Sequence, residues 1–139
     1  MNRMQQERKA GRDQFTRLTR VAMAEVVPSP PRRWSDEEWA TICWGHWPRD
    51  MDDKWLAFVE DDRLFLHRSW TGFGVYEAQF VRSRERWHIT ELLVSGDRST
   101  YRRASDAYEA LFVEALIDDL LLGNCHTDAW TRLRSMPRE

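Results

Sequence analysis

Two apolar runs joined by a short polar insert constrain the fold of this chain more than any other feature of its sequence. Trp55–Val59 and Leu64–His67 have the aromatic and aliphatic composition of β-strands, and Glu60-Asp61-Asp62-Arg63 lies between them. This pattern predicts a β-hairpin in which the two aspartates form the turn and the residues that flank them form a cross-strand pair.

The predicted hairpin register also sorts the side chains, because successive residues of a strand point to opposite faces of a sheet. One face holds Trp55, Ala57, Val59, Leu64, Leu66 and Arg68, and the other holds Leu56, Phe58, Phe65, His67 and Ser69. Both faces are largely apolar. The sheet therefore needs cover on both sides, from helices on each face or from helices on one face and a partner chain on the other.

Two more strand-like segments follow at short intervals. In Val75–Val81 the apolar and polar residues alternate. We expect Tyr76, Ala78 and Phe80 to face the core, and Glu77 and Gln79 to face water or a ligand. The turn at residues 83–86 leads into Trp87–Val94. Because the connections are short, the four strands are predicted to form an antiparallel β-meander.

Helical patterns occur on both sides of the strand region. Apolar residues at helical spacing predict an amphipathic N-terminal helix over residues 12–26, which ends before the proline-rich residues 28–31. Ser105 is expected to cap a long C-terminal helix that runs through Leu122. Thr127 is expected to begin a short last helix.

The segment Trp34-Ser35-Asp36-Glu37-Glu38-Trp39 carries the clearest local signal. The Ser35 hydroxyl can accept a hydrogen bond from the N–H of Glu38, whose carboxylate can return to the N–H of Ser35. Trp34 and Trp39 occupy the two positions of a hydrophobic staple. The segment therefore predicts a short Trp-rich helix that begins at the next residue after Ser35.

Length and composition bound the fold class. A chain of 139 residues matches one domain. We expect a single α+β domain over residues 12–135, a disordered N-terminus over residues 1–11 and a frayed C-terminus over residues 136–139. The class is thus a four-stranded antiparallel meander packed with an N-terminal helix, a short Trp-rich helix and a long C-terminal helix.

Charge, hydropathy and cysteine content narrow the function classes. The net charge of -2 argues against bulk nucleic acid as the main partner, although Arg82 to Arg103 form a basic patch whose binding to nucleic acid would weaken steeply with salt. No apolar run is long enough to span a bilayer, and we expect a cytoplasmic protein. Lysine is scarce beside arginine, which fits a GC-rich bacterial genome. Cys43 and Cys125 are expected to be buried thiols without a metal, and we expect no cofactor.

One short segment combines groups that could bind a ligand. His67-Arg68-Ser69-Trp70-Thr71-Gly72 brings an imidazole, a guanidinium, two hydroxyls and an indole to the end of a strand. Arg68 and the N–H groups of the turn could hold a phosphate or carboxylate while Trp70 stacks on a ring. The candidate ligand-binding residues are His67, Arg68, Ser69, Trp70, Thr71 and Tyr76.

Strand alternation limits this candidate site. His67 and Ser69 point away from Arg68, so all three converge only if the strand bulges or ends there. The alternative interpretation is structural. In that case Arg68 stacks over Trp55 across the hairpin, and the hydroxyls of Ser69 and Thr71 stabilise the turn.

No motif of a known catalytic centre is present, and whether the protein is an enzyme stays open. The leading hypothesis is a small binding or regulatory module that recognises a protein partner or a second copy of itself, as immunity and inhibitor proteins do. The eight tryptophans and the uneven charge support it. The alternative is a small-molecule site, enzymatic or sensory, that holds a nucleotide-like anion near Arg68 and Trp70 with the loop from Arg98 to Arg103.

Overall fold

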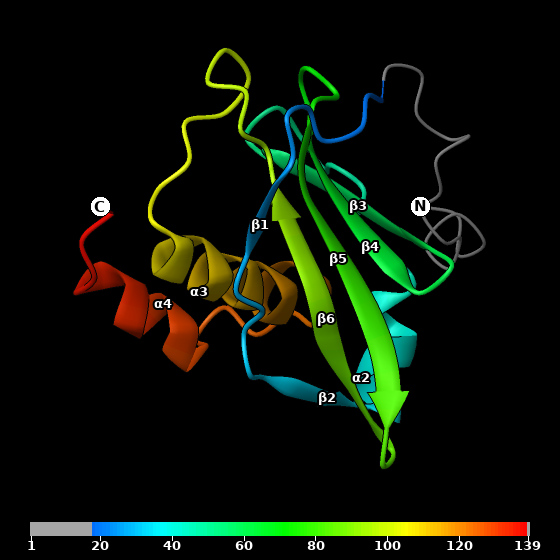
Figure 1. Ribbon diagram of the computed structural model, residues 1–139. Coiled ribbons are helices and arrows are strands. Elements are labelled where there is room, and N and C mark those ends of the chain that lie inside the picture. Colours follow the sequence, from blue (N-terminus) through cyan, green and yellow to red (C-terminus); the bar gives the residue numbers. More distant parts are fainter. Residues whose placement is uncertain (1–17, 139) are drawn as a thin grey trace.

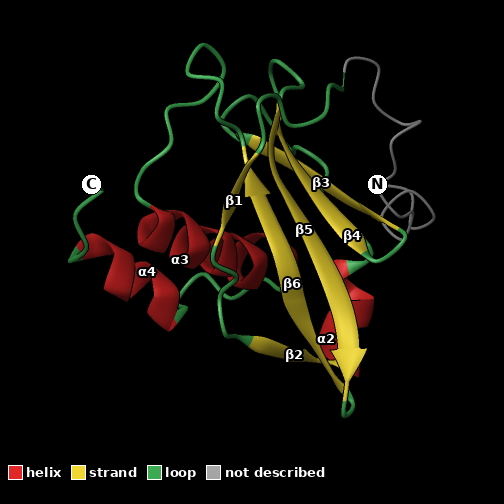
Figure 2. Cartoon of the chain, viewed as in Figure 1, coloured by secondary structure: helices red, strands yellow, loops and turns green. Residues whose placement is uncertain are grey.

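An antiparallel sheet forms the centre of the protein, and its helices lie on one side of it (Figures 1 and 2). The computed structural model describes residues 18–138. The strands are β1 (Glu25–Val27), β2 (Arg33–Ser35), β3 (Trp55–Glu60), β4 (Arg63–Arg68), β5 (Gly74–Ser83) and β6 (Arg86–Val94). They run in the order β1-β6-β5-β4-β3, and β2 also pairs with β6. The predicted α+β class is confirmed, but the sheet has six strands and not the four of the predicted meander.

The hairpin of β3 and β4 has the predicted register. Glu60 lies opposite Arg63, and Trp55 lies opposite Arg68 at the other end. Both turn residues have positive φ angles, 53° at Asp61 and 60° at Asp62, as a tight two-residue hairpin turn requires. Aspartate tolerates this backbone region better than most residues, which explains how two aspartates can form the turn.

The predicted N-terminal helix is wrong over the residues that the structure describes; residues 12–17, and the expected disorder of residues 1–11, lie outside them. Residues 25–27 form β1, which pairs with Leu92–Val94 at the edge of β6. After the proline-rich residues 28–31, β2 pairs with the same strand nearer its start. The open edge of β6 offers main-chain hydrogen bonds to an extended segment. This non-local pairing outweighs a helical periodicity that is only local.

The helices are α2 (Asp36–Ile42), α3 (Asp106–Leu116) and α4 (Asp128–Arg134). Ser35 caps α2 through both hydrogen bonds of the predicted capping box. The two stapling indoles pack on Phe80, with ring centroids 5.5 Å from it for Trp34 and 4.6 Å for Trp39. Ser105 caps α3 as predicted, and the helix ends in a π-helical turn over Ile117–Leu121.

The main core lies between α3 and the helix-facing side of the sheet. It contains the buried face predicted for the hairpin, extended by Tyr76, Ala78 and Phe80 of β5, which face the core as expected. A smaller cluster of Leu56, Phe58 and Phe65 lies on the opposite face with Leu18 packed against it. Among the described residues, no helix is both long and apolar enough to cross a membrane.

The two cysteines and the chain end differ from the expectations. Neither cysteine forms a disulfide bond within residues 18–138. Cys43 is half-buried but Cys125 is exposed, so the prediction of two buried thiols is wrong for Cys125. Its position in a loop after the last turn of α3 leaves it outside the core. Arg138 lies in the end that we expected to fray, yet its carbonyl accepts a hydrogen bond from the N–H of Ser105 at 2.6 Å.

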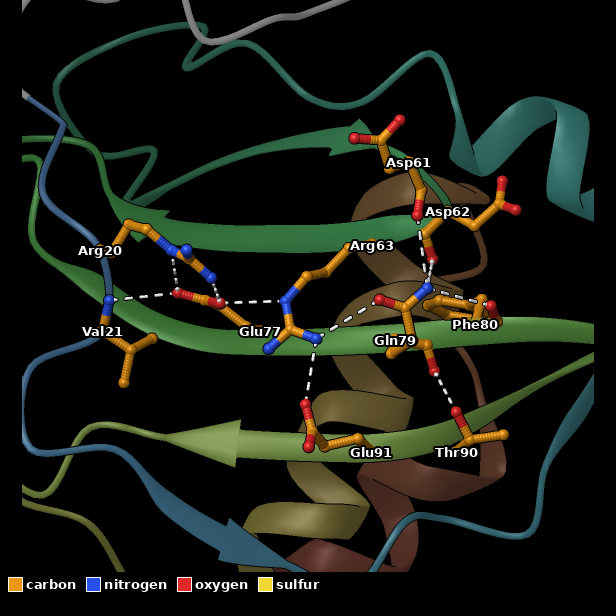
Figure 3. A network of polar contacts seen from close by, with 10 residues as sticks. All are labelled: Arg20, Val21, Asp61, Asp62, Arg63, Glu77, Gln79, Phe80, Thr90 and Glu91. Atoms are coloured by element: carbon orange, nitrogen blue, oxygen red, sulfur yellow. Dashed lines mark hydrogen bonds and ion pairs between the residues drawn. The ribbon is translucent and has the colours of Figure 1, made fainter.

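The sheet face opposite the helices carries a network of ion pairs around Glu77, a side chain that we expected to face water or a ligand (Figure 3). Its carboxylate is almost fully buried and accepts hydrogen bonds from Arg20 at 2.5 Å and from Arg63 at 3.0 Å. Arg63 also donates to Glu91 at 3.1 Å. Burial raises the pKa of Glu77, but the hydrogen bonds from Arg20 and Arg63 outweigh it, and the pKa lies below its ordinary value.

A lowered carboxylate pKa stabilises the folded state above the pKa of the unfolded chain, and this contribution is lost as the pH falls through the folded value. We therefore expect Glu77→Gln to lower the free energy of unfolding at neutral pH by about 1–3 kcal/mol. The deficit should begin to shrink as the pH falls below about 4.5, where the carboxylate of the unfolded chain takes up a proton, and it should be lost as the pH falls through the lower pKa of the folded state. Urea unfolding of the wild type and the variant, at neutral pH and at acid pH, measures this difference in the free energy of unfolding.

Glu91→Gln is the matched control, because Glu91 contacts the same Arg63 but its side chain is 49% exposed. An exposed pair contributes only about 0–1 kcal/mol. Equal deficits of Glu77→Gln at neutral and acid pH would contradict a role for the ionised carboxylate.

Candidate functional site

Three segments meet at the end of the sheet that carries the predicted site. They are the turn between β4 and β5 at residues 69–73, the segment before β3 at residues 50–54, and the loop after β6 at residues 97–102 (Figure 1, top of the view). One main-chain hydrogen bond, from the N–H of Ser69 to the carbonyl of Lys54, and two side-chain hydrogen bonds join the turn to the segment before β3. The Ser69 hydroxyl donates to the carbonyl of Asp53 at 2.6 Å, and the Trp70 indole donates to the carbonyl of Met51 at 2.9 Å.

The turn is also fixed from the other side by residues 19–21. The N–H of Thr19 donates to the carbonyl of Gly72 at 3.1 Å, and the N–H of Gly74 donates to the carbonyl of Thr19 at 2.8 Å. A Cβ atom at Gly74 would lie 2.7 Å from the main-chain nitrogen of Val21, so only glycine fits this close approach. The turn that presents Trp70 is therefore held rigidly.

Strand alternation separates His67 from Arg68, as predicted. The buried His67 ring stacks on Phe58 with centroids 5.5 Å apart, on the face away from α3, and its Nδ1 lies 3.0 Å from the carbonyl oxygen of Gly72. The hydroxyl of Thr71 accepts a hydrogen bond from the N–H of Phe73. The imidazole and the hydroxyls of the candidate site therefore stabilise the turn and its surroundings, and they do not converge on one point.

Arg68 stacks over Trp55 across the hairpin, which confirms the alternative interpretation of its position. Its Cζ lies 4.6 Å from the centroid of the Trp55 ring and 5.8 Å from that of Tyr101. The guanidinium is half-buried, and within residues 18–138 it forms no ion pair or side-chain hydrogen bond. The stacking fixes where the cation lies and leaves its N–H donors available.

Tyr76 belongs to the core below the site and does not reach its surface. Its hydroxyl donates to Glu109 at 2.7 Å and lies 2.9 Å from the hydroxyl of Tyr101. Burial raises the pKa of Tyr76 well above its ordinary value, and the nearby Tyr101 and Glu109 raise it further. Burial likewise raises the pKa of Tyr101. Both phenols therefore remain neutral donors.

The sequence interpretation missed Glu109, the acceptor that organises these phenols. It is fully buried in α3 and also accepts a hydrogen bond from the hydroxyl of Tyr101 at 2.8 Å. Glu109, Val113 and Leu116 follow one another at a spacing of four and three residues, which places the carboxylate on the buried stripe of the helix. That spacing is the signal that could have revealed it.

A groove opens beside Arg68 at the surface. We call this cavity of about 510 Å³ the Trp70 groove. It is lined by Met51, Asp52, Lys54, Arg68, Trp70, Thr71, Phe73, Ser99 and Thr100. Trp70 is 69% exposed and Met51 is 73% exposed, and Phe73 is also exposed. Apolar side chains that most proteins would bury thus surround a stacked cation.

A second cavity is also lined by Arg68. We call this cavity of about 280 Å³ the Arg138 cleft. It is lined by Arg68, Thr100, Tyr101, Arg102, Tyr108, Phe112 and Arg138. It shares Arg68 and Thr100 with the Trp70 groove, and its lining holds three arginines and no carboxylate. The lining of the Arg138 cleft comes from distant parts of the chain, and Arg68 is its one member that belongs to the predicted site. The Trp70 groove includes three residues of the predicted site, Arg68, Trp70 and Thr71.

Carboxylates partly neutralise the basic patch between Arg82 and Arg103. Arg82 donates two hydrogen bonds of 2.9 Å to Asp36, and Trp87 donates a third. The hydrogen bonds from Arg82 and Trp87 lower the pKa of Asp36 to about 2. Arg103 pairs with Glu25 and Asp106. Two arginines of the basic patch are therefore already bound to carboxylates.

Comparison of the chain with protein families, with curated proteins and with solved structures found no match in any of the three. Within residues 18–138, no three His, Cys, Asp or Glu side chains are grouped as metal ligands would be. A functional proposal for this protein therefore depends on the geometry of the Trp70 groove and the Arg138 cleft.

The hydrogen bond from Tyr101 to the buried Glu109 should contribute to stability independently of the ring that lies beside Arg68. We expect Tyr101→Phe, which keeps the ring, to lower the free energy of unfolding by about 1 kcal/mol. Tyr108→Phe is the control, because Tyr108 lies in the same cleft and its hydroxyl has no hydrogen-bond partner among residues 18–138. Equal stability of the two variants in urea unfolding would contradict this role of the Tyr101 hydroxyl.

Proposed function

We propose that the protein is a non-enzymatic binding module of the bacterial cytoplasm that recognises a protein partner, as immunity and inhibitor proteins do. The observation that carries this proposal is the Trp70 groove. There, exposed Met51, Trp70 and Phe73 surround a guanidinium that is stacked in place. Tryptophan and arginine are the residue types most enriched among the side chains that dominate binding energy at protein interfaces.

The groove is preorganised, which favours recognition of a partner. The indole of Trp70 is tied to the main chain of Met51, and the turn that carries it is held by hydrogen bonds on both sides. Ordering a side chain on binding costs about 0.5–1.5 kcal/mol, so a fixed indole retains more of its contact energy as affinity. Burying the exposed surface of one large aromatic ring can contribute about 2 kcal/mol or more.

The polar groups of the turn support a binding role over a catalytic one. Ser69 donates its hydroxyl proton to a carbonyl oxygen, and no base contacts its oxygen among residues 18–138. His67 lies on the opposite face of the sheet from the groove. A serine nucleophile needs an adjacent base at hydrogen-bond distance, and this pairing is not formed at the described site.

A small anionic ligand is the second candidate, and one observation favours it. Arg68 opens onto both cavities without a carboxylate partner among the described residues, next to Tyr101 and near Trp70. A nucleotide-like anion could pair with the guanidinium while its ring stacks on the indole. A thermal-shift screen with nucleotides and sugar phosphates separates the two functions, because only a small-molecule site predicts a rise in melting temperature.

We expect Trp70→Ala to weaken binding of the protein partner by about 30-fold, which corresponds to about 2 kcal/mol. Its loss of stability should be no more than about 1 kcal/mol, because the indole is mostly exposed and makes one exposed hydrogen bond to Met51. The partner can be captured with a photo-crosslinking residue in place of Thr71, which lines the groove and is exposed. Its affinity for the purified variants is then measured by calorimetry.

Trp44→Ala is the matched control, because Trp44 is 41% exposed at the end of α2 and does not line the groove. A crosslinking residue in place of Thr90, which is exposed on β6 outside the groove, controls for non-specific capture. Equal affinities of Trp70→Ala and Trp44→Ala for the captured protein would exclude the Trp70 groove as the binding surface.

A further inference from the structure

Arg68 departs from the rule that the other half-buried arginines of this protein follow. Within residues 18–138, four arginines are half-buried: Arg32, Arg63, Arg68 and Arg103. Three of them each contact two carboxylates. Arg32 contacts Glu38 and Asp118. Arg63 contacts Glu77 and Glu91, and Arg103 contacts Glu25 and Asp106. Arg68 contacts none of the described carboxylates. Partial loss of hydration without a counter-charge marks Arg68 as a cation that lacks its partner in the free protein.

The Arg138 cleft places two more guanidinium groups near this cation. Arg138 lies over the ring of Tyr108, with Cζ 5.1 Å from the centroid, and donates to the carbonyl of Arg102 at 3.1 Å. The side chain of Arg102 is exposed and forms no hydrogen bond or ion pair with the described residues. Arg68 and Arg138 are thus positioned by aromatic rings and not by carboxylates, so most of their N–H donors can still bind an anion.

We infer that the Arg138 cleft binds an acidic side chain of the protein partner, next to the apolar contact made in the Trp70 groove. This inference rests on the proposed function and adds the chemistry of the partner surface. The partner segment presents an apolar residue that packs on Trp70 and, next to it, an Asp or Glu residue. The two cavities share Arg68, so adjacent residues of one partner segment can occupy both.

The chemistry of the cleft fits a carboxylate. The fork of N–H donors on a guanidinium matches the two oxygens of a carboxylate, and the rings of Tyr101, Tyr108 and Phe112 can cover the methylene groups of a glutamate. The lining has no acidic residue that would repel the ligand, in contrast to the Trp70 groove, which includes Asp52. Charge complementarity of this kind fixes register and raises the rate of association.

The decisive experiment measures the affinity of the full chain for the captured partner. It compares a double variant, which carries both Arg102→Gln and Arg138→Gln, with the single variant Arg98→Gln. Arg98 lies on the same loop as Arg102 and is exposed, but it does not line the cleft. We expect the double variant to bind the partner about tenfold more weakly and Arg98→Gln to bind as the wild type does. Arg102→Gln alone supplies the comparison if the double variant does not fold, since the Arg102 side chain is exposed and forms no hydrogen bond or ion pair with residues 18–138.

A second measurement identifies the anion without the natural partner. Side-chain NMR signals of the arginines are followed while hexaglutamate, hexaglutamine or inorganic phosphate is added. We expect hexaglutamate to shift the signals of Arg68, Arg102 and Arg138, less so as salt is raised, and hexaglutamine to leave them unchanged. Shifts with phosphate and none with hexaglutamate would overturn the inference in favour of a small anion.

The outcomes separate this inference from the proposed function. If Trp70→Ala weakens partner binding as expected while the double arginine variant binds as tightly as Arg98→Gln does, the proposed binding module is correct and the acidic side chain in the Arg138 cleft is wrong. If hexaglutamate occupies the cleft but Trp70→Ala has no effect on the captured partner, the cleft binds an acidic peptide and the Trp70 groove is not the partner surface.

Discussion

The contacts of one indole connect the core of this protein to its candidate site. The Trp55 ring is only 8% exposed, and its centroid lies 6.0 Å from that of Tyr76 and 6.2 Å from that of Phe112. It therefore joins β3 to β5 and to α3. The same ring carries the guanidinium of Arg68 at 4.6 Å. Because large aromatic rings contribute strongly to packing, the position of the cation is fixed by the same contacts that stabilise the fold.

The parts of the fold that local interactions determine could be predicted from the sequence. The Asp61-Asp62 turn and the capping box of Ser35 with Glu38 each depend on residues close in the chain, and both are formed as expected. The N-terminal helix failed for the opposite reason. Its competitor, β1, is stabilised by hydrogen bonds to Leu92–Val94, almost seventy residues away in the chain, as the register of the pair shows. The spacing of apolar residues within 12–26 holds no information about an unpaired strand edge elsewhere in the fold, so the sequence pattern could not predict β1.

In the candidate site, too, the features that depend on neighbouring residues could be predicted, and those that depend on the tertiary fold could not. Alternation along β4 correctly separated His67 from Arg68, because side-chain direction in a strand is a local property. Tyr76 was expected to face the core and does, so it supports the site from below and does not line it. The Arg138 cleft was missed because its lining joins β4, the loop after β6, α3 and the chain end, and only the tertiary fold brings these segments together.

The distribution of charge indicates why the arginine of this site differs from the others. Elsewhere in the described chain, two buried carboxylates are matched by cations within the fold: Glu77 by Arg20 and Arg63, and Asp118 by Arg32. The third, Glu109, accepts hydrogen bonds from two neutral phenols. Such pairing offsets part of the desolvation cost in the free protein and occupies the donors that a partner would need. At Arg68 the cost is only partly offset by the stacked indole, so the remaining capacity can be satisfied by an incoming carboxylate. A site of this kind gives up some stability in the free protein and gains selectivity, because a neutral segment in its place would leave the guanidinium buried and unpaired.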